Sequence, residues 1–204
     1  TNNFPEIVYA YHQFIEANIT VDVVSPEGGQ IPIGYIHSSD TLLQKYLFDE
    51  ALSKKLKNTL KPTNVPVESY SAIYYVGGGS AMFTVPYDKE IQNIAQRIYE
   101  ENGGIIAAVC HGTAGIVEIQ LGNGDFLVKG KNVSGFPDIF EDKKARYFQE
   151  FPFSIQEEIE KHGGSFKYSE EGWDNFALSD GRLITGQDPT GAKAVAKMVI
   201  DKIQ

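Results

Sequence analysis

A short apolar run that ends in the chain's only cysteine constrains the fold more than any other stretch. Residues 105–109 are Ile-Ile-Ala-Ala-Val, long enough for one buried strand, and Cys110 follows at once. The small residues Ala108 and Gly112 stand two positions before and after the cysteine. A strand that delivers a side chain onto a strained turn, from which a helix departs, needs small neighbours because the backbones approach closely. The pattern predicts a nucleophile elbow with Cys110 at its tip.

The elbow also suggests a reactivity for the cysteine. The helix expected after it would point its N-terminal amides at the sulfur, and His111 is the next residue. Both features favour the thiolate over the thiol. A lone cysteine at the end of an apolar strand is often only a packing residue. The order of the elements around Cys110 therefore has to decide between a nucleophile and an inert side chain.

Composition limits the partners and the compartment. The 204 residues carry a net charge of −9 without a Lys/Arg cluster, which argues against nucleic acid and anionic membranes as partners. No apolar stretch approaches the ~20 residues that span a bilayer. One cysteine cannot form an internal disulfide, which fits the cytoplasm. The chain starts at Thr1 without methionine, and a cleaved targeting segment stays compatible with that start. We expect one domain over residues 1–204.

Helical and strand-like patterns alternate along the chain. Helices are expected over residues 6–17, 89–101, 154–161 and 192–203, with shorter ones within 41–60, 110–119 and 141–150. Strands are expected over 19–25, 72–76, 105–109 and 165–168, with a hairpin in 124–135 and a strand pair at 175–178 and 182–185. This alternation predicts an α/β fold with a mostly parallel sheet covered by helices on both faces.

Two special turns follow neighbouring strands of that predicted sheet. The strand 72–76 runs into Gly77-Gly78-Gly79-Ser80, and the strand 105–109 runs into the turn at Cys110. Ligands of parallel sheets bind beyond the carboxyl ends of the strands. The glycine turn lacks both common phosphate-loop patterns, so nucleotide binding there is rejected. We expect the two turns to meet at one site.

Four stretches together resemble the ThiJ/PfpI superfamily, a flavodoxin-like group related to class I glutamine amidotransferases. They are Glu6-Ile-Val-Tyr-Ala-Tyr, Val76-Gly-Gly-Gly-Ser-Ala-Met, Ala108-Val-Cys-His-Gly-Thr-Ala and Leu183-Ile-Thr-Gly-Gln-Asp-Pro-Thr. The stretches Ser25-Pro-Glu-Gly-Gly and Leu127-Val-Lys-Gly-Lys-Asn-Val-Ser-Gly-Phe resemble the branch of heat-shock-protein-31-type chaperones and glyoxalase III. The resemblance implies a three-layer α/β/α sandwich with a nucleophile elbow.

The resemblance also implies roles for particular residues. Cys110 matches the family's nucleophile, and His111 matches the histidine beside it. Glu6 matches the glutamate that lies next to the nucleophile. The backbone N–H groups of Gly78 and His111 match the oxyanion hole. No metal and no organic cofactor is implied.

The acid that orients His111 is less clearly marked. The spacing from Gly135-Phe136-Pro137 to Glu141 resembles the position where this branch places that acid. Asp138 and Asp142 lie close enough in the sequence to be rivals. We expect Glu141 to take the role and leave the two aspartates as alternatives.

The chain departs from the family pattern at three places. Gly79 stands where many relatives have a histidine, so one binding contact is absent. Ala10 replaces the usual proline four residues after the first glutamate. The family's first strand, which lies at the centre of the sheet, is missing from these residues, and we expect it upstream of Thr1 or trimmed from the sequence.

The resemblance implies a glutathione-independent glyoxalase, which converts methylglyoxal or a similar 2-oxoaldehyde to a 2-hydroxy acid through a cysteine hemithioacetal. Two alternatives stay open. One is a stress-response holdase chaperone or redox sensor that acts through oxidation of Cys110. The other is a cysteine-histidine amidase or peptidase. The resemblance also implies a homodimer.

A few further side chains are interpreted as structural. His12, His37 and His162 show no metal-ligand spacing, so we expect surface residues and no metal site. Trp173 and the neighbouring Glu170-Glu171 fit a pocket rim or plain surface packing equally well.

Overall fold

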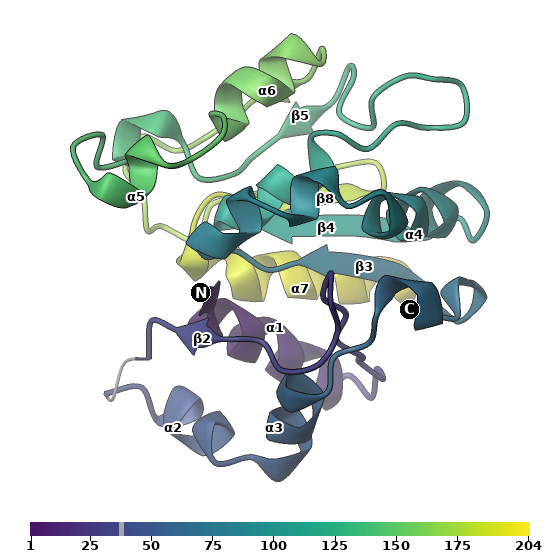
Figure 1. Ribbon diagram of the computed structural model, residues 1–204, viewed down its shortest axis with the longest axis vertical. Helices are drawn as coiled ribbons and strands as arrows, with labels where there is room; N and C mark the ends of the chain where they lie inside the picture. The colour runs from purple at the N-terminus through teal and green to yellow at the C-terminus, as the bar shows by residue number, and fades with distance from the viewer. Residues whose placement is uncertain (37–38) are drawn as a thin grey trace.

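A four-stranded sheet lies at the centre of the computed structural model, which describes residues 1–36 and 39–204 (Figure 1). Its order is β3 (Ala72–Tyr75), β4 (Ile105–Val109), β8 (Leu183–Gly186) and β7 (Ala177–Asp180). The first three strands run parallel, and β7 is antiparallel at one edge. The mostly parallel sheet and the strand pair near the C-terminus are therefore confirmed.

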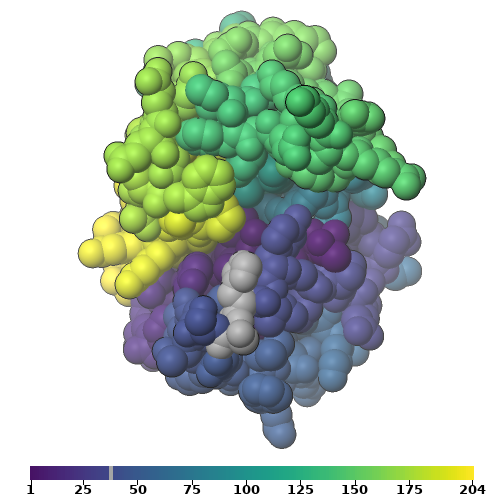
Figure 2. All heavy atoms as spheres, turned by 90° about the vertical axis from the view of Figure 1, so that its left-hand side faces the viewer, coloured from purple at the N-terminus to yellow at the C-terminus, as the bar shows by residue number. Residues whose placement is uncertain are grey.

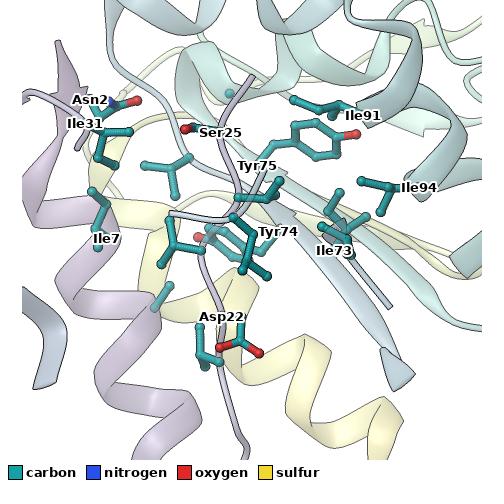
Figure 3. Close-up of a pocket in the computed structure, with 18 of the residues that line it drawn as sticks. Asn2, Ile7, Asp22, Ser25, Ile31, Ile73, Tyr74, Tyr75, Ile91 and Ile94 are labelled. Carbon is teal, nitrogen blue, oxygen red and sulfur yellow. The ribbon is translucent and has the colours of Figure 1, made fainter. Parts of the chain in front are cut away.

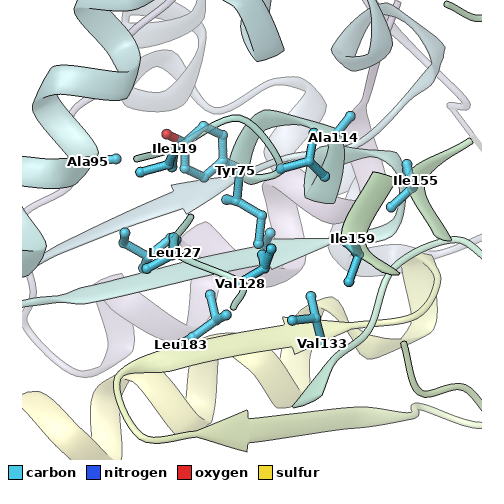
Figure 4. Packing of buried hydrophobic residues seen from close by; sticks show 14 of the residues in the cluster. Tyr75, Ala95, Ala114, Ile119, Leu127, Val128, Val133, Ile155, Ile159 and Leu183 are labelled. Carbon is cyan, nitrogen blue, oxygen red and sulfur yellow. The ribbon is translucent and has the colours of Figure 1, made fainter. Parts of the chain in front are cut away.

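The central strand β4 explains why both faces of the sheet are covered. Every residue of β4 is buried. Ile106 and Ala108 pack into one apolar cluster, whereas Ile105 and Ala107 pack into another on the opposite face. Side chains alternate between the faces of a strand, so a strand that is apolar throughout needs a layer on each side. Figure 4 shows the first cluster, in which Leu127, Val128 and Ile159 meet Tyr75 and Leu183.

Helices supply the two outer layers. On one face α1 (Phe4–Glu16) packs beside α7 (Ala192–Ile203), and on the other lie α4 (Lys89–Glu100) and α6 (Ile155–Lys161) (Figure 1). The expected three-layer α/β/α arrangement is confirmed. None of the helices among the described residues is both long and apolar enough to cross a membrane. The smaller elements are β1 (Asn2–Asn3), β2 (Ile33–Gly34), α2 (Thr41–Leu47), α3 (Glu50–Lys57), β5 (Asn132–Val133), α5 (Arg146–Gln149) and β6 (Ser165–Phe166).

The start of α1 places Glu6 at the carboxyl end of the sheet. Asn3 caps the helix, and its side-chain oxygen accepts a hydrogen bond of 3.2 Å from the N–H of Glu6. Pro5 occupies the first turn, where its missing N–H costs nothing. The N–H of Asn3 in turn donates to the carbonyl of Gly77, 2.9 Å away. The helix start is thus tied directly to the turn that follows β3.

The expected strand over residues 19–25 is not formed. Only a single parallel bridge, Val24 to Leu60, is found in this segment. The segment is extended and passes β3 at a distance, because a large cavity lies between them (Figure 3). The alternation of apolar and polar residues correctly predicted an extended chain. A strand also needs a neighbouring strand at hydrogen-bonding distance, and this segment has none among the described residues.

That cavity has a volume of about 730 Å³ and is mainly apolar. Ile7 and Ile31 line it on one side and Ile73, Tyr75 and Ile94 on the other (Figure 3). β3 forms the edge of the four-stranded sheet, so one row of its backbone groups faces this space. Cys110, His111 and Glu6 are not among the described residues that line it.

Three other expectations need correction. The hairpin over 124–135 is wrong, since β5 pairs in parallel with β6 instead. The helix expected over 141–150 is limited to α5, Arg146–Gln149. A 3-10 turn at Asp138–Phe140 and an extended Glu141 precede it. The helix after Cys110 is a 3-10 helix, Cys110–Ile116, in place of an α-helix.

Candidate active site

The turn at Cys110 has the strained geometry of an elbow. Cys110 has a φ of +57°, a backbone angle that residues other than glycine rarely adopt. The residue is only 3% exposed. A side chain at Gly112 would approach the carbonyl oxygen of Tyr75 to 2.5 Å. A side chain at Gly77 would lie 3.0 Å from the Cβ of Cys110. The small residues around the cysteine are therefore required by close backbone approach.

A chain of polar contacts runs from the sulfur outward. The Sγ of Cys110 lies 3.4 Å from Nδ1 of His111, and Nε2 of His111 lies 2.7 Å from Oε1 of Glu141. The side chains of His111 and Glu141 are 11% and 5% exposed. With Glu141 ionised as the acceptor, the ring hydrogen belongs on Nε2. Nδ1 then presents its lone pair to the thiol of Cys110.

The two aspartates that could have replaced Glu141 are occupied elsewhere. Both carboxylate oxygens of Asp138 accept hydrogen bonds of 2.8 Å from the hydroxyl of Ser154. Asp142 accepts a hydrogen bond of 3.1 Å from the backbone N–H of Lys144. Of the three acids, Glu141 is the one that the structure brings to His111.

Glu6 is completely buried beside the cysteine. Its Oε2 accepts a hydrogen bond of 2.6 Å from the N–H of Gly77. Its Oε1 makes no hydrogen bond of ordinary geometry with any described residue. Burial raises the pKa of Glu6 to about 8, against the opposing effects of the Gly77 N–H and the Cys110 thiol. Glu6 is thus mainly a neutral carboxylic acid at neutral pH and can donate a proton.

The thiol itself differs from the expectation. Burial, followed by the charge of Glu6, raises the pKa of Cys110 well above its usual value. The N–H of His111 donates to the sulfur and lowers that pKa, but this contribution is smaller than the effect of burial. The turn therefore lowers the pKa of Cys110 as expected, but burial outweighs this effect and favours the thiol in the free protein. A base must take the proton when a substrate arrives, and His111 is in contact.

The buried Glu6 makes folding stability depend on pH. An acid whose pKa is raised on folding favours the folded state at low pH, where it is protonated in both states, and opposes it as the pH rises from about 4.5 to about 8. The Glu6→Gln variant keeps an acceptor for Gly77 but cannot ionise. We expect its free energy of unfolding relative to wild type to rise by several kcal/mol between pH 5 and 8. Urea unfolding at both pH values measures this, and a difference that does not change with pH contradicts the buried acid.

Aromatic side chains surround His111. Phe136 stacks on its ring with a centroid distance of 4.6 Å, and Phe151 lies 5.3 Å away. Trp173 contacts Phe136 edge-on at 6.2 Å and is 55% exposed, so it stands at the rim of the site. A side chain at Gly79 would meet Phe151 at 3.8 Å. Phe151 therefore lies beside Gly79, the position at which the resemblance implied a missing histidine contact.

The site lies where distant segments meet. In the space-filling view the segment around residues 140–150 and the segment around 165–175 come together above the N-terminal residues (Figure 2). Glu6 comes from the start of α1, Cys110 and His111 from the end of β4, and Glu141 from the loop before α5. The residues that the resemblance singled out are thus brought together. Glu170 and Glu171 are exposed and take no part in these contacts.

Asp188 is a residue of this site to which the sequence pattern assigned no role. It is fully buried, and its charge raises the pKa of both Glu6 and Cys110. Its oxygens accept hydrogen bonds from the N–H of Trp173 and from the N–H and hydroxyl of Thr190. The sequence Asp-Pro-Thr, an N-cap ahead of proline, was the available signal.

The remaining histidines are only partly as expected. His12 is half-buried and contacts the hydroxyl of Tyr46 at 3.1 Å. His37 lies outside the described residues. His162 is not a surface residue, because only 7% of its side chain is exposed and its ring stacks on Phe126 at 3.5 Å. Glu158 and Glu118 lie beside it, two possible metal ligands that the spacing along the sequence did not indicate.

Comparison with known proteins agrees with this site. The family model described as the DJ-1/PfpI family matches residues 4–202, nearly the whole chain. The chain belongs to the DJ-1/PfpI family. Within that family it is 34% identical over 168 residues to "Glyoxalase 3" of Candida albicans, a match that covers 76% of this chain and 69% of that protein. It is 28% identical to "Glutathione-independent glyoxalase HSP31" of Saccharomyces cerevisiae, over 98% of this chain and 87% of the other.

Two solved structures that are similar to this chain have the same fold. The Francisella tularensis Rapid Encystment Protein superposes with a TM-score of 0.90 at 30% identity, covering 98% of this chain and 89% of that one. Glyoxalase III from Candida albicans superposes with a TM-score of 0.85 at 29% identity, covering 97% and 86%. The resemblance seen in the sequence motifs is therefore confirmed over the length of the chain.

Proposed function

We propose that this DJ-1/PfpI protein is a glutathione-independent glyoxalase that converts methylglyoxal, or a similar 2-oxoaldehyde, to the 2-hydroxy acid. The observation that carries the proposal is the chain of contacts from Cys110 through His111 to Glu141, next to the neutral acid Glu6. The relatives named as glyoxalases support the choice of reaction.

The first step is addition of the thiol to the aldehyde. Nδ1 of His111 takes the proton from Cys110 as the sulfur attacks, and the imidazolium that forms faces Glu141. The aldehyde oxygen becomes an oxyanion, and the proposed donors to it are the N–H groups of Gly78 and His111. The N–H of His111 already points at the sulfur. Return of the proton from His111 gives a neutral hemithioacetal.

The second step moves a hydrogen between the two substrate carbons. His111 removes the proton from the former aldehyde carbon while Glu6 gives its proton to the neighbouring ketone oxygen, which forms an enediol. His111 then returns the proton to the neighbouring carbon, and the hydroxyl of the first carbon gives its proton back to Glu6. The product is a thioester of the 2-hydroxy acid. One carbon is oxidised and the other reduced, so no external oxidant is needed.

The last step is hydrolysis. Water, deprotonated by His111, attacks the thioester carbonyl, and the same two N–H groups stabilise the oxyanion. The carbon–sulfur bond breaks, and the thiolate recovers its proton from His111. The sum is addition of one water to the 2-oxoaldehyde.

Incubation of the purified protein with methylglyoxal in the absence of any added thiol tests the function. We expect lactate to accumulate in proportion to methylglyoxal consumed, at a rate that glutathione does not increase. A folded protein that consumes methylglyoxal without producing lactate would be a scavenger of aldehydes, and the proposal would be wrong.

Two further statements belong to the proposal. We propose a homodimer, which the resemblance to the superfamily supports and light scattering measures. We also propose a cytoplasmic location, which is supported by a single cysteine that no internal disulfide can use.

A further inference from the structure

Three side chains that can bind metals meet close to the residues that follow the 3-10 helix of the elbow. Glu118 follows the 3-10 helix that begins at Cys110, whereas Glu158 and His162 lie four residues apart at the end of α6. Their oxygen and nitrogen ligand atoms all lie within 4.8 Å of one another. Ligands of a tetrahedral ion with bonds of about 2.0–2.1 Å stand roughly 3–3.5 Å apart. The three ligand atoms are thus spaced somewhat more widely than in a bound site, and an ion would have to draw them together.

His162 is held in the orientation of a metal ligand. Its Nδ1 lies 2.8 Å from the carbonyl oxygen of Val117, so Nδ1 carries the hydrogen and Nε2 keeps its lone pair. Nε2 faces Glu158, whose Oε1 is 3.4 Å away. The ring stacks flat on Phe126, with an interplanar angle of 5°. A backbone carbonyl on one ring nitrogen commonly fixes a histidine whose other nitrogen binds a metal.

The ligand set favours one class of ion. One imidazole with two carboxylates suits a divalent first-row transition metal, whereas magnesium and calcium prefer oxygen ligands alone. The two carboxylates would neutralise the charge of the ion. We propose that Glu118, Glu158 and His162 bind a zinc-type divalent ion, with water in the remaining position.

Lys161 competes for the same carboxylate. Its Nζ lies 2.5 Å from Oε1 of Glu158, but 66% of its side chain is exposed and can turn into solvent. An exposed pair of this kind contributes little to stability. A bound ion would replace one cation by another and would fasten α6 to the segment that carries Cys110.

Isothermal titration with zinc chloride tests the site, and cobalt chloride gives a visible spectrum for the same complex. We expect one ion per chain in the wild-type protein. The Glu118→Gln and Glu158→Gln variants should each lower the affinity by about tenfold or more, because each loses an anionic ligand of similar shape. Lys161→Met should raise it by up to about fivefold.

Matched controls separate this site from others. Glu157→Gln changes an exposed carboxylate of the same helix outside the cluster and should leave the affinity unchanged. Cys110→Ala should also leave it unchanged, so the test is independent of the proposed glyoxalase activity. Absence of binding at millimolar zinc, or binding that survives both Gln variants but is lost with Cys110→Ala, overturns the proposal.

Thermal unfolding gives a second measure that does not need a fitted stoichiometry. A ligand that binds only the folded state raises its stability with concentration. Saturating zinc should therefore raise the unfolding midpoint of the wild type and of Glu157→Gln, and leave Glu118→Gln unmoved. Equal shifts in all three proteins contradict the site.

Discussion

Replacing Cys110 with alanine is expected to lower kcat/KM for methylglyoxal by roughly 10⁴-fold or more, because no other group in the chain can form the thioester. Alanine keeps a Cβ at the same positive φ, so the strain of the turn is retained. Lactate formation measured by an enzyme-coupled assay, over several enzyme concentrations, gives the ratio.

The control for this variant is its fold. A circular dichroism spectrum and unfolding midpoint close to those of the wild type show that only the sulfur has been lost. Turnover above about one tenth of the wild-type rate in a folded Cys110→Ala protein would mean that the sulfur is not the nucleophile. The alternative of a holdase chaperone would then gain support if the variant still prevented a client protein from aggregating.

Replacing Glu141 with glutamine is expected to lower kcat by roughly 10²–10⁴-fold. A carboxylate accepts the hydrogen of His111 Nε2, whereas an amide can donate to that nitrogen and move the hydrogen to Nδ1. His111 would then face the thiol with the wrong tautomer and could not take its proton. Steady-state kinetics with methylglyoxal, compared over a range of pH, measures the loss.

The neighbouring aspartates supply matched controls for Glu141→Gln. Asp142→Asn and Asp138→Asn remove the same charge from the same loop, but neither carboxylate contacts His111. Both variants should keep kcat within about threefold of the wild type, as expected for changes away from the reacting groups. A loss in Asp142→Asn as large as in Glu141→Gln would attribute the effect to the charge of the loop.

Local sequence patterns predicted the parts of the fold that depend on neighbouring residues. The run 105–109 is apolar on both faces, and such a strand has to lie inside a parallel sheet. The small residues around Cys110 similarly predicted a close backbone approach, and the distances at Gly77 and Gly112 confirm it. The pairing of β7 with β8 followed from a short turn between two strand-like segments.

Features that depend on distant segments could not be predicted in this way. The sequence presents three carboxylates within five residues, and the path of the loop 136–142 decides that only Glu141 meets His111. The pKa of Cys110 depends on complete burial and on Glu6 and Asp188, which are 104 and 78 positions away along the chain. The sequence pattern predicted backbone amides next to the sulfur, which lower the pKa of Cys110. It did not predict the larger, opposite effect of burial on that pKa.

The cavity beside β3 has an energetic consequence. Its lining is mainly apolar around a volume of about 730 Å³, and apolar surface that stays unburied adds nothing to the free energy of unfolding. Apolar side chains that filled this space would bury that surface and stabilise the folded state. Hydrophobic dyes and small apolar ligands should bind the 204-residue chain there, so their binding is no measure of access to Cys110.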